Sequence, residues 1–150
     1  MKRARNCEVY VDGASRGNPG PSGAGVVFLD GNAKPIRQLS RFLGETTNNV
    51  AEYLALIYAL QDAIHHGCTA VTVRTDSELL VRQLSGEYRV RDPQLRLFHD
   101  LARHLIEGLV QCSVTHVPRG QNILADRLAG RAADSRSSTL FCDKSIGEPA

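Results

Sequence analysis

Four acidic residues stand where predicted strands end or predicted helices begin. Asp12 ends the short apolar run "CEVYVD", and Asp76 ends the run "AVTVRTD". Glu52 lies near the start of a predicted helix, one turn past its cap, and Asp126 lies near the start of the last predicted helix. Neighbouring parallel strands bring their carboxyl ends to one edge of a sheet, where open α/β sheets usually place their sites. The sequence therefore allows four carboxylates to gather at that edge.

Such a cluster would have a definite chemistry. Carboxylates repel one another unless protons or cations compensate. Carboxylate oxygens with no Cys or His ligand set suit hard cations such as Mg²⁺ or Mn²⁺. Two such ions about 3.5–4 Å apart could hold the attacking and leaving oxygens of a phosphodiester. Taken singly, each acid has a simpler interpretation as a solvated turn, cap or first-turn residue.

The elements that must position these acids follow from the apolar patterning. Three strands before the first helix predict an antiparallel meander, and the later αβ units predict crossovers. The order is βββαβααβα, with strands at 7–12, 23–30, 34–43, 70–76 and 110–118 and helices at 46–67, 77–86, 92–108 and 122–135. We expect an α/β fold with a five-stranded mixed sheet flanked by helices. It would form one domain over residues 1–135, followed by a polar tail at 136–150.

Composition sets further bounds. A chain of 150 residues, 42% of them hydrophobic, suits one domain with one core. No apolar run approaches the ~20 residues of a membrane span, and no apolar signal core precedes Asp12, so a cytoplasmic protein without membrane contact is expected. The net charge of +2 permits nucleic-acid binding without requiring it. The cysteines form no C-x-x-C pair, although a docked tail could bring Cys142 to Cys68.

Four segments, in order and spacing, resemble the type 1 ribonuclease H family. They are "VDGASRGNPGPSGAG", "TTNNVAEYLALIYAL", "TDS" at 75–77 and "HVPRGQNILADRLAG", and the resemblance runs from about residue 7 to residue 134. It implies the ribonuclease H fold in a compact, monomeric form without a hybrid-binding domain. It also implies an endonuclease that cuts the RNA strand of an RNA–DNA hybrid and leaves 5′-phosphate and 3′-hydroxyl ends.

The resemblance also assigns roles to single residues. Asp12 would bridge two Mg²⁺ ions, for which Mn²⁺ can substitute. Asp126 would help hold the ion that activates the attacking water, while Glu52 and Asp76 would hold the ion near the leaving 3′-oxygen. Contacts to the hybrid are implied for Gly13, Asn18, Thr47, Asn48, Asn49, Ser77 and Arg119. The asparagines match readers of ribose 2′-hydroxyls or base edges, and Thr47 matches a ligand of a DNA-strand phosphate. Turn and cap chemistry is the alternative for these residues.

The chain departs from the family pattern in ways that concern the substrate. The connection "PRGQ" lacks the mobile His of many members, His116 falls within a predicted strand, and Arg119 or Asn122 is left to fill that space. Glu45 stands where several members carry an Arg, two residues before the phosphate-binding Thr47. The basic, Trp-rich protrusion of some members is missing, although three arginines of that region could still meet phosphates: Arg89, Arg91 and Arg96.

Two alternatives therefore stay open. One is a nuclease of the same fold with a looser choice of substrate that includes double-stranded RNA, which Glu45 and the missing protrusion favour. The other is a nucleic-acid-binding module that has lost catalysis, against which the presence of all four acids argues.

Overall fold

Six strands form one mixed sheet in the order β5-β4-β1-β2-β3-β6 in the computed structural model, which describes residues 5–143 and Ile146. The elements are β1 (Asn6–Ser15), β2 (Gly20–Leu29), β3 (Pro35–Thr46), α1 (Asn48–His65), β4 (Ala70–Thr75), α2 (Glu78–Leu84), α3 (Pro93–Glu107), β5 (Gln111–His116), a 3₁₀ turn (Arg119–Gln121), α4 (Ile123–Ser135) and β6 (Thr139–Cys142). The predicted α/β class and mixed sheet are confirmed.

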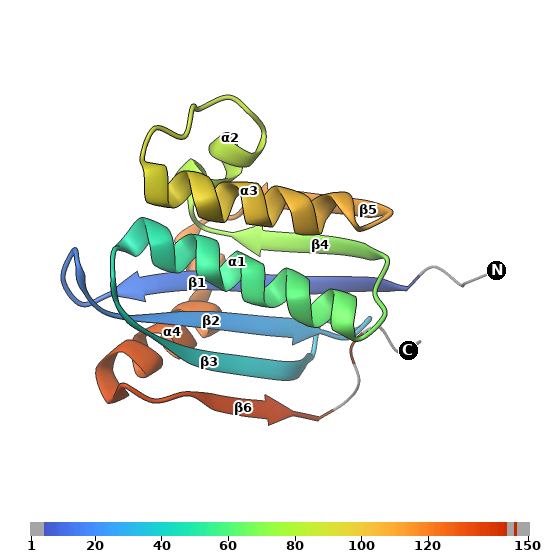
Figure 1. Ribbon diagram of the computed structural model, residues 1–150. Helices are drawn as coiled ribbons and strands as arrows, with labels where there is room; N and C mark the ends of the chain where they lie inside the picture. The colour runs from blue at the N-terminus through green and yellow to red at the C-terminus, as the bar shows by residue number, and fades with distance from the viewer. Residues whose placement is uncertain (1–4, 144–145, 147–150) are drawn as a thin grey trace.

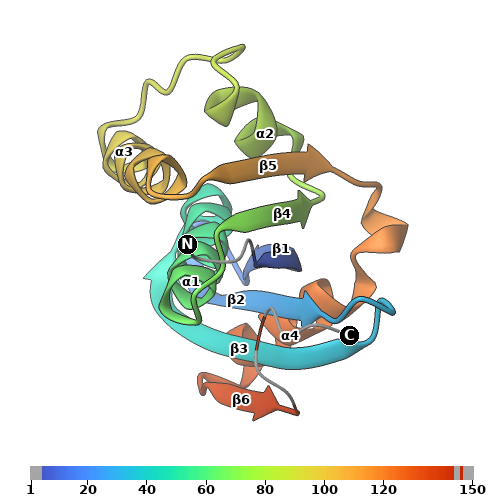
Figure 2. The same cartoon turned by 90° about the vertical axis from the view of Figure 1, so that its right-hand side faces the viewer.

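The sheet has the predicted topology. β1, β2 and β3 pair antiparallel as a meander, while β4 pairs parallel with β1 and β5 pairs parallel with β4. Helices α1 and α3 cover one face, and α4 covers the other over β1, β2 and β3 (Figures 1 and 2). None of the helices in the described ranges is both long and apolar enough to cross a bilayer.

Local sequence signals start the helices that carry or flank the predicted site. The Thr47 hydroxyl accepts a hydrogen bond from the Val50 N–H at the start of α1, and the Ser77 hydroxyl accepts one from Leu80 N–H at the start of α2. These bonds satisfy amides that a helix leaves free at its first turn. Both residues therefore have the cap role that was the alternative to a substrate contact.

The loop predicted at 13–22 is shorter in the structure. β1 runs past Asp12, predicted to be its last residue, on to Ser15, and β2 begins at Gly20. Gly13, predicted as a loop residue, lies in this added part of β1 and permits close packing rather than a turn. A Cβ on Gly13 would lie 2.3 Å from the Ala51 carbonyl carbon of α1. A Cβ on Gly25 would lie 2.0 Å from the Ala125 carbonyl oxygen of α4. These glycines bring α1 and α4 directly onto the strands.

The sixth strand was not predicted. Part of the expected polar tail forms β6, which pairs antiparallel with β3, for example Leu39 with Leu140. Leu140 and Phe141 remain 54% and 62% exposed, so backbone pairing at the open edge of β3 accounts for the strand better than apolar burial does. Hydrophobic patterning does not detect a strand of this kind.

The end of the chain also contributes to the core. Ile146 is 1% exposed, and its carbonyl accepts a hydrogen bond of 2.8 Å from Arg5 Nη2. The remainder of the predicted tail lies outside the described residues. The hypothesis that Cys142 approaches Cys68 is wrong, because Cys68 is buried against the Cys7 thiol while Cys142 is exposed on β6.

Truncating the Ile146 side chain tests whether it anchors the end of the chain in the core. Ile146→Ala is expected to lower the free energy of unfolding by about 2–5 kcal/mol, as for other buried aliphatic side chains. Phe141→Ala, on the exposed β6, should change it by no more than about 0.5 kcal/mol. Denaturant titration measures both, and equal losses for the two variants would contradict a buried anchor at Ile146.

Candidate active site

Three of the predicted acids converge at the carboxyl ends of β1 and β4. One carboxylate oxygen from each of Asp12, Glu52 and Asp76 lies within 4.8 Å of the other two. Asp12 and Glu52 are buried, and Asp76 is largely so. The positions follow from the fold, because Val11 and Thr75 are the last register partners of the parallel pair β1–β4. The next residues, Asp12 inside β1 and Asp76 just after β4, therefore lie side by side where this pairing ends.

Glu52 reaches this group from the helix layer. It lies in α1, and its Oε1 accepts a hydrogen bond from the Gly13 backbone N–H on β1. The contact depends on the close approach of α1 that the missing side chain of Gly13 allows. A glycine directly after Asp12 thus positions the second carboxylate beside the first.

Asp126 completes the set from the opposite face of the sheet. It lies in the first turn of α4 and is exposed, in contrast to the other three acids. Its carboxylate is close enough to that of Asp12 for a hydrogen bond that favours the protonated form of Asp12. The structure therefore brings all four predicted acids to one edge, with Asp126 on the solvent side.

Burial and crowding raise the proton affinity of the Asp12 and Glu52 carboxylates. Burial, followed by the nearby Glu52 carboxylate, raises the pKa of Asp12 well above its ordinary range. Burial likewise raises the pKa of Glu52 to about 7, although hydrogen bonds to Asp12 and to the Gly13 N–H oppose the shift. Without a cation, the pair should hold a proton at neutral pH.

Asp76 supplies the observation that fits a cation. Its Oδ2 is buried and has no hydrogen-bond partner among the described residues. Arg119 Nε lies 3.8 Å away, which is too long for a hydrogen bond. An orphaned carboxylate oxygen beside two further carboxylates is a costly arrangement in a protein interior unless a positive charge offsets it. The all-oxygen donor set fits Mg²⁺ or Mn²⁺ better than a softer metal.

The residues predicted to contact a hybrid lie around this cluster. Asn18 Oδ1 accepts a 3.0 Å hydrogen bond from the Asn48 N–H, so the loop after β1 is tied to the start of α1, one turn before Glu52. Asn18, Asn48 and Asn49 are all exposed. Arg119 is 86% exposed in its side chain and is the cation nearest to Asp76. The geometry is compatible with substrate contacts, which stay predictions.

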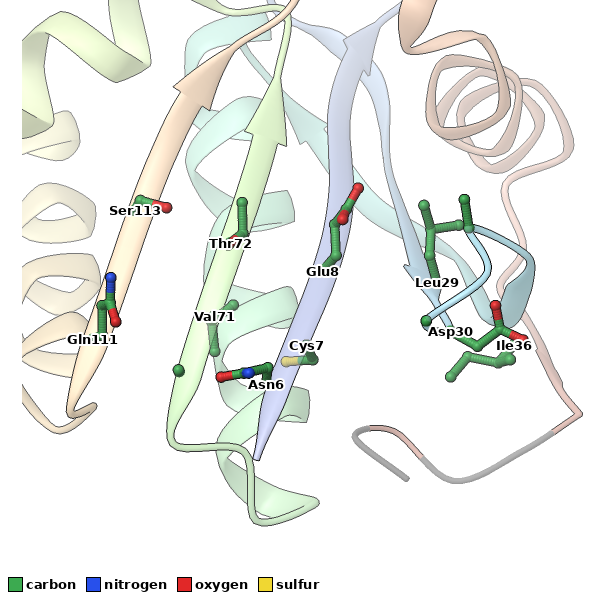
Figure 3. Close-up of a pocket in the computed structure, with 13 residues that line it drawn as sticks. Asn6, Cys7, Glu8, Leu29, Asp30, Ile36, Val71, Thr72, Gln111 and Ser113 are labelled. Atoms are coloured by element: carbon green, nitrogen blue, oxygen red, sulfur yellow. The ribbon is translucent and has the colours of Figure 1, made fainter. Parts of the chain in front are cut away.

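A separate cavity of about 470 Å³ lies at the other end of the sheet (Figure 3). Residues from β1, β2, β4 and β5 line it, including Asn6, Glu8, Thr72 and Ser113. None of the four predicted acids is among them, and Glu8, one of its two acidic lining residues, is paired with Arg74. This cavity is therefore distinct from the carboxylate site.

Comparison with known proteins agrees with the geometry. The family model described as "Reverse transcriptase-like" matches residues 10–132. Ribonuclease HI of Halobacterium salinarum is 43% identical over 132 residues, which are 88% of this chain and 66% of the relative. The chain belongs to the ribonuclease H family.

Solved ribonuclease H structures match over most of the chain. The crystal structure of RNase H1 from Halobacterium salinarum matches with a TM-score of 0.83 at 43% identity, covering 87% of this chain and 98% of that one. LC11-RNase H1 in complex with an RNA/DNA hybrid matches with a TM-score of 0.81 at 42% identity. The match covers 87% of this chain and 98% of that one. Among the curated relatives, the chain spans 66% of the archaeal protein but only 37% of bifunctional protein Rv2228c of Mycobacterium tuberculosis, to which it is 39% identical over 136 residues.

Two residues near this site make contacts that the sequence does not predict. Arg136, in the left-handed turn after α4, places its Nη2 4.0 Å from Glu45 Oε1 and so offsets the charge of Glu45. Asn122 is buried, and its side chain bonds to Val11 in the middle of β1. No sequence signal links Arg136 to Glu45, because only the packing of α4 on the sheet brings them together.

The raised pKa values predict how stability depends on pH in the metal-free ribonuclease H chain. Above the ordinary carboxyl pKa of about 4, the native state binds more protons than the unfolded chain, so the free energy of unfolding falls as pH rises. The slope should be about 1.4 kcal/mol per pH unit for each retained proton, up to the pKa of Glu52 at about 7.

Calorimetry between pH 5 and pH 8 measures this slope. Mg²⁺ should stabilise the protein more at pH 8 than at pH 5, because it competes with the bound proton, and Glu52→Gln should flatten the slope. A metal-free protein that is more stable at pH 8 than at pH 5 would contradict the expected proton uptake.

Proposed function

We propose that the protein is a metal-dependent endonuclease that cleaves the RNA strand of RNA–DNA hybrids by two-metal-ion hydrolysis, leaving 5′-phosphate and 3′-hydroxyl ends. The observation that carries the proposal is the cluster of Asp12, Glu52 and Asp76, with an orphaned Asp76 oxygen and Asp126 beside it. The match to LC11-RNase H1, whose structure contains an RNA/DNA hybrid, supports the choice of substrate.

The acids have distinct proposed roles. Asp12 and Asp126 would hold one Mg²⁺, and Asp12, Glu52 and Asp76 would hold the second, with Mn²⁺ as a substitute. The bound ions would supply an acidified water and charge stabilisation for the phosphodiester. The chain's own contribution is to orient the oxygens, and the Gly13 N–H does this for Glu52.

The substrate would lie across the loop after β1 and the start of α1. We propose that Asn18, Asn48 and Asn49 contact base edges or ribose 2′-hydroxyls, and the 2′-hydroxyl is the group that marks an RNA strand. The Asn18–Asn48 hydrogen bond would hold both residues in register for this task. Gly13 and Ser77, next to Asp12 and Asp76, would border the RNA backbone.

Arg119 would take the space of the loop His that this chain lacks. Its exposed guanidinium near Asp76 is suited to a phosphate oxygen and is not suited to removing a proton, since a guanidinium is always protonated in proteins and only donates hydrogen bonds. We therefore assign Arg119 to binding of the RNA strand at the cut site and not to general-base catalysis.

We propose that Thr47 and Arg136 both contact the DNA strand. Glu45 alone would repel a phosphate there, but Arg136 beside it supplies the opposite charge. Further phosphates could meet Arg89, Arg91 and Arg96, which border a cavity of about 890 Å³ beside Tyr88.

Substituting Arg136 tests whether its side chain contacts a phosphate of the DNA strand. Arg136→Gln is expected to weaken hybrid binding and to lower the slope of log K against log salt by about 0.7–0.9, the loss of one phosphate contact. Lys34→Gln removes the same charge from the exposed turn between β2 and β3 and is expected to leave the slope unchanged. Fluorescence anisotropy from low to moderate salt measures both, and indistinguishable slopes would exclude an Arg136–phosphate contact.

A substrate panel tests the function itself. Purified protein is incubated with labelled RNA–DNA hybrid, double-stranded RNA and single-stranded RNA, each with Mg²⁺, with Mn²⁺ and with chelator. Internal cuts in the RNA of the hybrid alone, abolished by chelator, are expected. Equal cutting of double-stranded RNA would favour the looser nuclease, and binding without any cutting would favour an inactive module. The cytoplasmic location and the monomeric state stay predictions.

A further inference from the structure

Asn122 is a buried polar residue at the junction between β1 and α4. It is 1% exposed and immediately precedes α4, which starts at Ile123. Its Nδ2 donates a 2.8 Å hydrogen bond to the carbonyl oxygen of Val11, the residue directly before Asp12. The side chain thus connects the start of α4 to the middle of β1, 111 residues away in the sequence.

The backbone of the same residue leads to the second acid. The Asn122 carbonyl accepts a 3.1 Å hydrogen bond from the Asp126 N–H, within the first turn of α4. Asn122 is therefore bonded through its side chain to the peptide that carries Asp12 and through its backbone to Asp126. Its side chain makes no capping bond to α4, so the amide is committed to β1.

This arrangement carries a cost that packing alone would avoid. Asn122 Oδ1 is buried and has no hydrogen-bond partner in the part of the chain that the structure describes. A buried polar atom without a partner destabilises the fold, whereas a leucine of similar size would not incur this cost. A leucine would also lack the donor for Val11. Only the side-chain amide of Asn122 can connect α4 to β1 in this way.

We propose that Asn122 is a positioning residue that sets the spacing of Asp12 and Asp126, and through it the affinity of the carboxylate site for a divalent cation. The inference rests on the proposed function, because that function requires both acids to share an ion. Groups that orient metal ligands from outside the coordination sphere typically change metal affinity or activity 10–100-fold when removed.

The test compares variants that loosen α4 in different places. Asn122→Ala removes the tie to β1, and Asn122→Leu removes it while filling the space and eliminating the unpaired oxygen. Ser40→Ala is the matched control, because the Ser40 hydroxyl donates a buried 2.6 Å hydrogen bond to the Leu128 carbonyl and so ties the same helix to β3.

Three quantities are measured for each variant: Mn²⁺ affinity of the protein alone by calorimetry, thermal unfolding without metal, and KM and kcat for the hybrid at several Mg²⁺ concentrations. Both Asn122 variants are expected to bind Mn²⁺ about 10–100-fold more weakly and to need correspondingly more Mg²⁺ for turnover. KM for the hybrid should stay unchanged. Ser40→Ala should unfold at a lower temperature and still bind Mn²⁺ normally.

The outcomes separate this inference from the proposed function. If the wild-type chain binds no Mn²⁺ and cuts no hybrid, both fall together. If the wild type binds Mn²⁺ and Asn122→Leu binds it equally well, the positioning role alone is overturned. If Ser40→Ala loses as much Mn²⁺ affinity as Asn122→Ala, the effect belongs to the general attachment of α4, and the specific role of Asn122 is likewise overturned.

Discussion

Replacing Asp12 with asparagine is expected to reduce hybrid cleavage by at least about 10³-fold. The other three acids all influence the carboxyl group of Asp12, Glu52 and Asp126 at hydrogen-bond distance and Asp76 through its charge. Asparagine keeps the shape of the Asp12 side chain and removes its negative charge. Loss of an anchored metal removes several kcal/mol of transition-state stabilisation, and each 1.4 kcal/mol is about a factor of ten in rate.

The same substitution should not harm the fold. A neutral amide in place of the Asp12 carboxylate would relieve the repulsion among buried carboxylates, so the metal-free variant should unfold at a temperature equal to or above that of the wild type at pH 8. Single-turnover cleavage and thermal unfolding give the two readouts. Asp134→Asn is the control, because it makes the same change on an exposed α4 residue whose ion pair with Arg16 contributes little. A cleavage rate for Asp12→Asn close to that of the control would refute the assigned role.

Adding a single methyl group at Gly25 is expected to destabilise the protein by at least about 3 kcal/mol. The new Cβ would lie 2.0 Å from the Ala125 carbonyl oxygen and 2.9 Å from the Ala129 N. Both are backbone atoms of α4, which have no rotamer by which to move away. Overpacking usually costs about 1–3 kcal/mol, and here relief requires displacing a whole helix from the sheet.

Such a displacement should also affect the site, because α4 carries Asp126. Gly25→Ala should therefore lose Mn²⁺ affinity together with stability, whereas Gly120→Ala, where a Cβ meets nothing within 4 Å, should change the free energy of unfolding by no more than about 0.5 kcal/mol. Denaturant unfolding measures the stability of both variants. A Gly25→Ala protein as stable as Gly120→Ala would contradict the close packing of α4 on β2.

The sequence by itself determined the elements whose signals are local. Thr47 and Ser77 begin helices because their hydroxyls accept amide hydrogen bonds within the next turn, and this needs no partner from elsewhere. The placement of Asp76 at the end of β4 also followed from patterning, whereas Asp12, predicted to end the first strand, lies inside β1, which continues to Ser15. Because parallel strands align their carboxyl ends, the sequence was sufficient to anticipate that these acids meet.

Tertiary structure decided the features that depend on two distant segments. β6 forms because the edge of β3 offers unpaired backbone groups, and its exposed Leu140 and Phe141 give no hydrophobic signal. The glycines after Asp12 look like turn residues in the sequence, yet at Gly13 and Gly25 the missing side chain serves the approach of a helix. Local patterns report hydrogen bonding within a few residues. Packing sets the distance between a strand and the helix that crosses it. It therefore also sets the spacing of Asp12 from Glu52 and Asp126.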